Sequence, residues 1–129
     1  LVAVAALPLG PYAPGYELLF VYGEERMGCS GHAMLRGAVR LGEAILSGFT
    51  VTRGERAVAA RCRDGGSCKV RGELYLVPAS LLRLLDAVKS GYARRERVVV
   101  TASGNVELEA WAYVSGGEVE GPKMEEGSC

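Results

Sequence analysis

Residues 18–28 read LLFVYGEERMG: an apolar run that ends in Tyr22-Gly23 and passes into a polar turn closed by Gly28. A short apolar run rich in β-branched and aromatic residues and stopped by glycine predicts a buried strand, here over residues 17–22. The turn that follows carries two adjacent acidic residues, Glu24 and Glu25. The segment therefore predicts a core strand that leads directly into a charged turn.

Further short strand patterns and two helix patterns follow along the chain. Strands are expected over residues 43–51, 56–61, 69–77, 97–101 and 106–114. Ser103-Gly104-Asn105 predicts a hairpin between the last two strands. A helix is expected over residues 79–88, where Leu81, Leu84, Leu85 and Val88 share one face, and a shorter one over residues 30–39. This pattern predicts an α+β fold: a small mixed β-barrel or curled sheet of about six or seven strands with two flanking helices.

The length and composition bound the domain organisation. A chain of 129 residues, about half of them apolar, is the size of one domain with its own core. Residues 1–15 contain three prolines and predict an N-terminal tail, residues 16–115 the domain, and the glycine- and glutamate-rich residues 116–129 a flexible C-terminal tail. The apolar start lacks a charged leading region and is interrupted by Pro8, so we expect neither a membrane span nor a secretory signal, and a cytoplasmic location.

The charge pattern excludes several partners. The formal net charge is zero and no basic stripe is present. Nucleic acid and membrane surfaces are therefore not expected partners. A monomer and a homodimer both remain open.

Glutamine is absent and Asn105 is the only asparagine. Depletion of heat-labile amides is one trend of thermophilic proteins, although GC-rich coding would give the same bias.

The four cysteines do not form a metal-binding pattern. None belongs to a CxxC pair, and the single histidine, His32, cannot complete a zinc site of usual spacing, so we expect no metal and no cofactor. Cys62 and Cys68 bracket the sequence RDGGS, which is typical of a hairpin tip. Residues opposite each other on paired strands lie within reach of a disulfide, so two free thiols and a bond between Cys62 and Cys68 are both open.

Four segments in this chain resemble the gamma-glutamylcyclotransferase-like family in their order and spacing. They are the Tyr22-Gly23 turn, GELY at residues 72–75, LLDAVKSGYARR at residues 84–95 and EAWAYV at residues 109–114. The resemblance covers roughly residues 18–114 and implies a cyclotransferase-type barrel, in which backbone N–H groups of the turn hold the carboxylate of a small gamma-glutamyl-type metabolite. On this basis we expect the ligand to be bound by Tyr22, Gly23, Glu24, Glu25, Tyr75, Lys89, Tyr92 and Tyr113.

The resemblance also implies a reaction, and here the chain departs from the family. Such enzymes release 5-oxoproline from a gamma-glutamyl amide, and one carboxylate can both accept and return the proton. In the family this carboxylate is a glutamate about three residues after a Leu-Asp pair. Leu85-Asp86 is present here, but the matching position is Lys89, and two glutamates stand in the turn where the family has small or apolar residues.

Two interpretations of these charges follow. Lys89 can pair with Glu24 or Glu25 across the mouth of the pocket and exclude an amino-acid substrate, or all three can be solvated surface charges. We predict a degenerate member that binds a small metabolite or a partner. The alternative is an active cyclotransferase-type enzyme whose acid/base role has moved to Glu25 or Glu24. A third possibility is an oligomeric module without a ligand.

Overall fold

The first strand, β1 (Tyr16–Val21), is buried on both faces. In the computed structural model, which describes residues 15–54, 56–63, 67–120 and 124–125, Leu18 and Phe20 point into one apolar cluster and Leu19 and Val21 into another. A strand with two buried faces has no polar alternation, which is why its sequence is a continuous apolar run. β1 therefore lies between two layers of the core.

The described residues form eight strands and one α-helix. The strands after β1 are β2 (Val39–Ser47), β3 (Phe49–Arg53), β4 (Ala57–Cys62), β5 (Lys69–Pro78), β6 (Arg94–Ala102), β7 (Val106–Val119) and β8 (Met124–Glu125). The α-helix is α1 (Ala79–Lys89), and short 3-10 helices are η1 (Gly23–Glu25), η2 (Ser30–Leu35) and η4 (Ser103–Asn105). In the part of the chain that these ranges cover, no helix is both long and apolar enough to span a bilayer.

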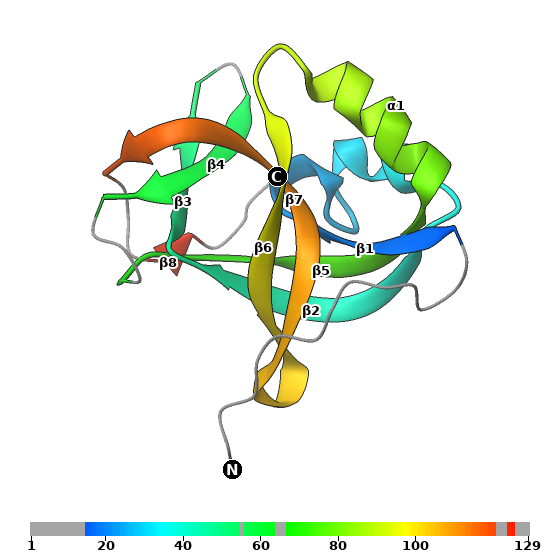
Figure 1. Ribbon diagram of the computed structural model, residues 1–129, viewed down its shortest axis with the longest axis horizontal. Helices are drawn as coiled ribbons and strands as arrows, with labels where there is room; N and C mark the ends of the chain where they lie inside the picture. Colours follow the sequence, from blue (N-terminus) through cyan, green and yellow to red (C-terminus); the bar gives the residue numbers. More distant parts are fainter. Residues whose placement is uncertain (1–14, 55, 64–66, 121–123, 126–129) are drawn as a thin grey trace.

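Five strands close into a barrel, as the sequence pattern predicts. The hydrogen-bonded order β1–β5–β2–β6–β7 returns to β1 through a parallel pairing in which Leu19 lies opposite Trp111. The β3–β4 hairpin continues the sheet, because β4 pairs in parallel with β7. Figure 1 shows this extension and β8 at one end of the molecule, with α1 at the other. The α+β class and the mixed barrel are thus confirmed.

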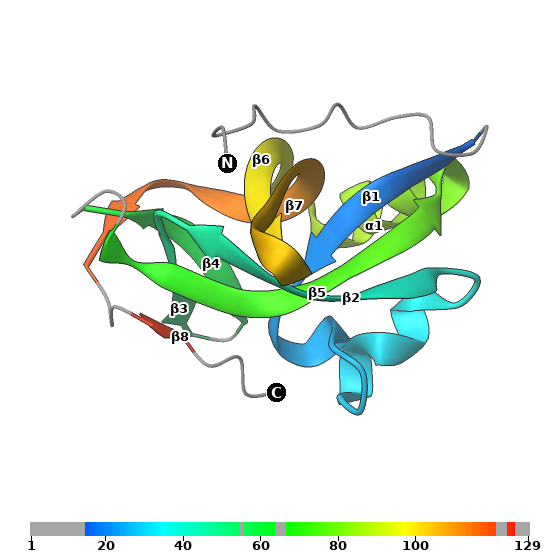
Figure 2. The ribbon, with the colours of Figure 1, turned by 90° about the horizontal axis from the view of Figure 1, so that it is seen from below.

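The core has two parts that share the barrel wall. Inside the barrel lie alternate residues of all five staves, together with residues of β3 and β4. Outside it, α1 and η2 cover one flank with Leu35, Leu81, Leu82 and Leu85, packed on outward-facing residues of β1, β5 and β7. Figure 2 shows α1 beside β1 and β5 on this flank. Complete burial of a leucine contributes about 1.5–3 kcal/mol, so this layer holds α1 firmly on the barrel.

The helix α1 confirms the predicted span but not the predicted buried face. Leu84 and Val88 are 53% and 51% exposed, whereas Leu82 and Lys89 are buried together with Leu81 and Leu85. The helix is rotated so that Lys89 points inward. Apolar periodicity alone could not show this rotation, because a buried lysine requires a partner from elsewhere in the chain.

Two other elements differ from the expectation. The strand predicted over residues 43–51 is broken at Gly48, whose positive φ of 86° turns the chain from β2 into β3. The helix predicted over residues 30–39 is the 3-10 helix η2, so one α-helix rather than two flanks the barrel in the described residues. Its hydrogen bonds span three residues, as in His32 N–H to the Cys29 carbonyl at 3.1 Å, which suits a short connector.

The C-terminal boundary also needs correction. The composition predicts a flexible tail over residues 116–129, but β7 continues to Val119, and Glu118 and Val119 pair with Arg61 and Cys62 of β4. β8 then pairs with the start of β5. These pairings satisfy backbone groups that an open strand edge would expose, so the extension has a structural role. Of the predicted N-terminal tail over residues 1–15, residues 1–14 lie outside the described residues.

A disulfide joins Cys62 at the end of β4 to Cys68 just before β5, with a Cα–Cα distance of 6.1 Å. This resolves the choice between two free thiols and a bond that the sequence left open. Both cysteines are buried, and their bond holds the ends of β4 and β5 together next to the terminal part of β7.

We predict that Gly72→Ala destabilises the barrel by about 3 kcal/mol. A Cβ at this position of β5 would lie 2.2 Å from the Val21 carbonyl oxygen and 2.6 Å from the Phe20 ring, and the backbone oxygen cannot move aside easily. Urea denaturation measures the effect. Gly91→Ala is the matched control, because an added Cβ there meets no atom within 4 Å. Equal stability of the two variants would contradict this account of the β1–β5 contact.

Candidate functional site

The turn after β1 is fixed at its first residue. Tyr22 is extended, and its buried hydroxyl donates to the Tyr113 carbonyl while it accepts the Ala59 N–H at 2.9 Å. Burial, and then nearby negative charge, raises the pKa of Tyr22 far above its ordinary value, so the hydroxyl stays protonated and keeps both bonds. Gly23, with a φ of 66°, then turns the chain into η1. Tyr22 thereby ties the turn to both β4 and β7.

The turn brings Glu25 to the last residue of α1. The Lys89 ammonium donates to Glu25 Oε2, and the two side chains are 9% and 13% exposed. The predicted ion pair is therefore present, with Glu25 as the partner, whereas the side chain of Glu24 lies outside the described residues. The alternative that Lys89 and Glu25 are solvated surface charges is wrong.

Two tyrosines surround the ammonium of this pair. Lys89 Nζ lies 5.7 Å from the ring centroid of Tyr92 and 5.6 Å from that of Tyr113, and 3.5 Å from the Tyr92 hydroxyl. These distances lie within the range of cation–π attraction. A largely desolvated ammonium thus has a carboxylate, two aromatic rings and a hydroxyl as its neighbours.

The expected ligand pocket is filled by these side chains. It is lined by Tyr22, Glu25, Arg56, Ala57, Lys89, Tyr92, Ala93 and Tyr113 and holds about 20 Å³. That volume suits about one water molecule, whereas ligand pockets span about 300–1,000 Å³. Arg56 is a wall residue that the sequence did not suggest, with its guanidinium 4.8 Å from the Tyr92 ring centroid. Arg56 lies next to the turn because of the position of the β3–β4 hairpin, and no local sequence pattern predicts that position.

Most predicted site residues meet here, and Tyr75 does not. Tyr22, Glu25, Lys89, Tyr92 and Tyr113 all line the closed pocket, and Gly23 lies in the turn beside it. Tyr75 instead packs with the outer layer, where its ring centroid is 5.8 Å from that of His32. The polar residues that alternate with Tyr75 along β5 favour a place beside a ligand, but that side of β5 is covered by η2 and the turn.

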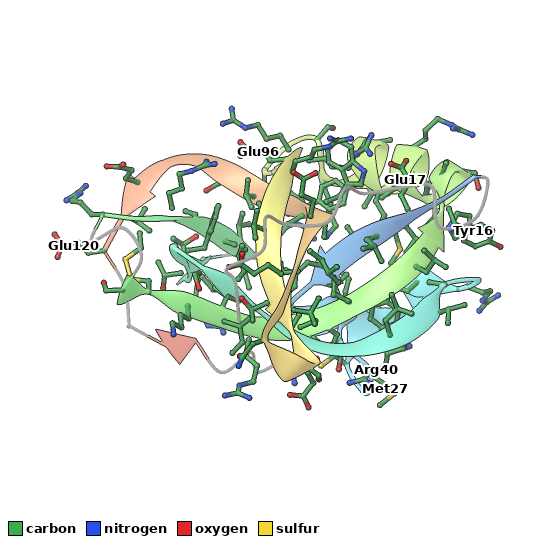
Figure 3. All side chains as sticks on the ribbon, turned by 60° about the horizontal axis from the view of Figure 1, so that its bottom comes forward. Tyr16, Glu17, Met27, Arg40, Glu96 and Glu120 are labelled. Atoms are coloured by element: carbon green, nitrogen blue, oxygen red, sulfur yellow. A yellow bond between two sulfur atoms is a disulfide. The ribbon has the colours of Figure 1, made fainter. Side chains whose placement is uncertain are left out.

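Glu73 is a buried carboxylate that the sequence analysis missed. It is 4% exposed and accepts the Met27 N–H and the Tyr75 hydroxyl, both at 2.9 Å, and Arg40 Nη2 lies 3.4 Å away. Figure 3 shows Met27 and Arg40 side by side. Glu73 thus anchors the far end of the turn to β5, as Tyr22 anchors its start. The sequence carries one sign of this buried carboxylate, which is a glutamate between apolar residues of the GELY strand.

The pKa of Glu73 follows from these contacts. Burial by itself would raise it, but the bonds from Met27 and Tyr75 and the charge of Arg40 outweigh burial and hold the pKa below its usual value. Burial and the bond to Glu73 in turn raise the pKa of Tyr75 to about 12. Near neutral pH, therefore, the carboxylate is ionised and the hydroxyl is its donor.

On the other side of Tyr113 lies an open hollow of about 400 Å³. The side chains of its wall are fixed by their contacts with one another. Arg95 forms two hydrogen bonds to Asp86, at 2.9 and 3.0 Å, and its guanidinium lies 4.4 Å from the Trp111 ring centroid. The Tyr113 hydroxyl donates to the same carboxylate at 2.7 Å. Burial, and then the contact with Asp86, strongly raises the pKa of Tyr113. The Asp86 carboxylate therefore accepts three hydrogen bonds, two from Arg95 and one from Tyr113.

We predict a coupling free energy of about 1–3 kcal/mol between Lys89 and Glu25 in a double-mutant cycle of Lys89→Met and Glu25→Gln. Either single change leaves a largely buried group without its partner, so the double variant should be more stable than the sum of the singles implies. Urea unfolding measures the cycle. The control pair Arg63–Glu120 is 60% and 78% exposed and should couple by less than about 0.5 kcal/mol. Similar coupling in both pairs would contradict a buried pair.

We predict that Glu73→Gln lowers stability at pH 7 by about 1–3 kcal/mol. Because the folded-state pKa of Glu73 is lowered, its contribution is fully present above the unfolded-state value of about 4.3 and is lost as the pH falls through the folded-state value. The variant should therefore lose less stability than the parent between neutral and acidic pH, measured by urea midpoints. Glu107→Gln, at an exposed carboxylate of β7, should keep the parent's pH dependence. A Glu73→Gln curve parallel to that of the parent would argue against this network.

Comparisons with known proteins agree with this fold. The family model for gamma-glutamyl cyclotransferase, AIG2-like, matches residues 19–128. None of the curated proteins compared with the chain matches it. A solved AIG2-like protein of Mus musculus shares 22% identity with a TM-score of 0.65 and covers 76% of each chain. An uncharacterised protein of Pyrococcus horikoshii shares 24% identity with a TM-score of 0.60 over 81% of each chain.

A third structure, of a gamma-glutamyl cyclotransferase, shares 21% identity with a TM-score of 0.64, over 78% of this chain and 66% of the other. At these identities the structural likeness establishes the fold alone, whereas the match of the family model extends over most of the sequence. The chain belongs to the gamma-glutamyl cyclotransferase, AIG2-like family.

Proposed function

We propose that this protein is a non-catalytic member of its family, which has kept the cyclotransferase barrel but binds a small metabolite or a partner instead of converting a gamma-glutamyl amide. The observation that carries the proposal is the Lys89–Glu25 ion pair. By the family resemblance, Lys89 stands at the position of the glutamate that transfers the proton. Its ammonium is bound to Glu25, so it cannot accept a proton from the substrate amine.

The volume of the site supports the same conclusion. A gamma-glutamyl amide is many times larger than the roughly 20 Å³ left between the side chains. To enter, it would have to separate Lys89 from Glu25 in a largely buried place, at a cost of several kcal/mol. Its α-carboxylate would then approach the turn next to Glu25, where like charges repel. Both effects oppose binding of the family's substrate.

One specific observation favours a second candidate. Glu25 is a carboxylate that lines the same closed pocket, beside Tyr22 and Tyr92. If the ion pair opened on substrate binding, Glu25 could accept the proton from the opposite wall, and the protein would be an active cyclotransferase-type enzyme with a relocated acid/base. This candidate requires substrate binding to supply the energy that separates the pair, so we place it second.

The two candidates predict different results with gamma-glutamyl amines and an assay for 5-oxoproline. We expect no turnover by the wild type and detectable turnover after Glu25→Leu combined with Lys89→Glu, because this double change removes the ion pair and returns a carboxylate to the family position. The family glutamate alone is worth about 10²–10⁴-fold as a general acid/base, so the gain should exceed one order of magnitude.

The control variant is Lys69→Glu, which makes the same charge change at an exposed position of β5 and should remain inactive. Wild-type turnover that Glu25→Gln abolishes would overturn the proposal in favour of the relocated acid/base. Thermal stabilisation by a metabolite, without any turnover, would support the binding function directly.

A further inference from the structure

The surroundings of the Lys89 ammonium resemble a binding site more than a rim ion pair. Two exposed ion pairs of the described residues, Arg61–Glu96 and Arg97–Glu109, also have an aromatic ring beside the guanidinium, but their arginine side chains are 47% and 57% exposed, whereas that of Lys89 is 9% exposed. Lys89 Nζ instead lies among Glu25 Oε2, the Tyr92 hydroxyl and the aromatic rings of Tyr92 and Tyr113. A carboxylate together with aromatic faces is the arrangement by which proteins recognise ligand ammonium groups.

We propose that Glu25, Tyr92 and Tyr113 form a binding box for the ammonium group of a small primary alkylamine, and that Lys89 is its internal occupant and competitor. This inference rests on the proposed function, since a site used for turnover would have to admit a different substrate. The ligand class follows from the contacts. The ammonium donates a hydrogen bond to Glu25, which a primary ammonium can do and a quaternary one cannot.

The charges of the walls set the stoichiometry. Glu25 is the only carboxylate among the described residues that line the pocket, and Arg56 already places a second cation 4.8 Å from the Tyr92 ring. The box therefore holds one ammonium at a time, and an external amine must replace that of Lys89. Exchange of one ammonium for another leaves the net charge of the box unchanged. The main free-energy cost is therefore that the ammonium of Lys89, which is covalently attached to the protein, is replaced by one from solution.

The covalent attachment of the Lys89 ammonium to the protein makes the wild type a weak binder of amines. Lys89 is the last residue of α1, and its position next to the box gives its ammonium a high effective concentration, by the argument that applies to any intramolecular competitor. Removal of that side chain beyond Cβ should therefore expose the affinity of the box. The part removed by Lys89→Ala corresponds to n-propylammonium, which makes this compound the matched probe.

The experiment titrates Lys89→Ala with n-propylammonium chloride against sodium chloride of equal concentration and follows the melting temperature. We expect a saturable rise, with half-saturation at a concentration at least about tenfold lower than any effect on the wild type, which is a difference of about 1.4 kcal/mol. The neutral probe 1-propanol should give no such rise. Addition of Glu25→Gln to Lys89→Ala should abolish it, and Lys69→Ala should behave like the wild type.

The proposal is overturned if propylammonium stabilises Lys89→Ala no more than sodium chloride does, or if 1-propanol or the Glu25→Gln background gives the same rise. If Lys89→Ala does not fold, the ¹⁵N resonance of the Lys89 ammonium in the wild type provides the readout. Displacement by propylammonium but not by sodium chloride supports the box, and an unchanged signal at saturating amine overturns it. Release of 5-oxoproline by the wild type would contradict the proposed function, whereas absence of amine binding would contradict the binding box alone.

Discussion

The burial of β1 on both faces is the constraint on which the rest of the structure depends. Leu18 and Phe20 fill the barrel while Leu19 and Val21 face the layer under α1, so β1 cannot shift by one residue without exchanging the two sets. This register fixes where the strand ends. The turn that begins at Tyr22 therefore emerges between the barrel and the C-terminal end of α1, and Glu25 is placed against Lys89.

The same constraint explains why the site is closed. A lysine at the end of α1 would ordinarily reach solvent, as its long side chain permits. Here the turn offers the carboxylate of Glu25, and the rings of Tyr92 and Tyr113 lie beside the ammonium. The helix α1 is rotated so that Leu84 and Val88 are exposed while Lys89 is buried. Polar anchors at both ends, Tyr22 at the start and Glu73 at Met27, hold the turn in this place. The closed pocket is thus a property of the whole arrangement and not of one segment.

The fold was predictable to the extent that its signals are local. Glycine and the hairpin residues Ser103–Asn105 mark chain reversals, and apolar runs mark strands, because these effects act over a few residues. The break at Gly48 was missed because apolar residues continue on both sides of it. η2 was read as an α-helix because composition does not separate three-residue from four-residue hydrogen bonding in so short a segment. The pairing of β7 beyond Ser115 depends on the edge of β4, which is distant in sequence.

The sequence by itself determined the α+β class with a curled sheet or barrel and the turn after β1, since residue identity and short-range periodicity carry that information. The match of Lys89 to the family's glutamate is what the resemblance implies. The tertiary structure alone decided that Glu25 is the partner of Lys89, that Arg56 joins the pocket wall, that Tyr75 belongs to the outer layer and that Glu73 is buried. The physical reason is that residue identity does not select the partner of a charged or hydroxyl side chain when that partner lies on another element. Its partner is whichever group the packing of apolar surfaces brings within hydrogen-bonding distance, and that packing joins residues as far apart as 25 and 89.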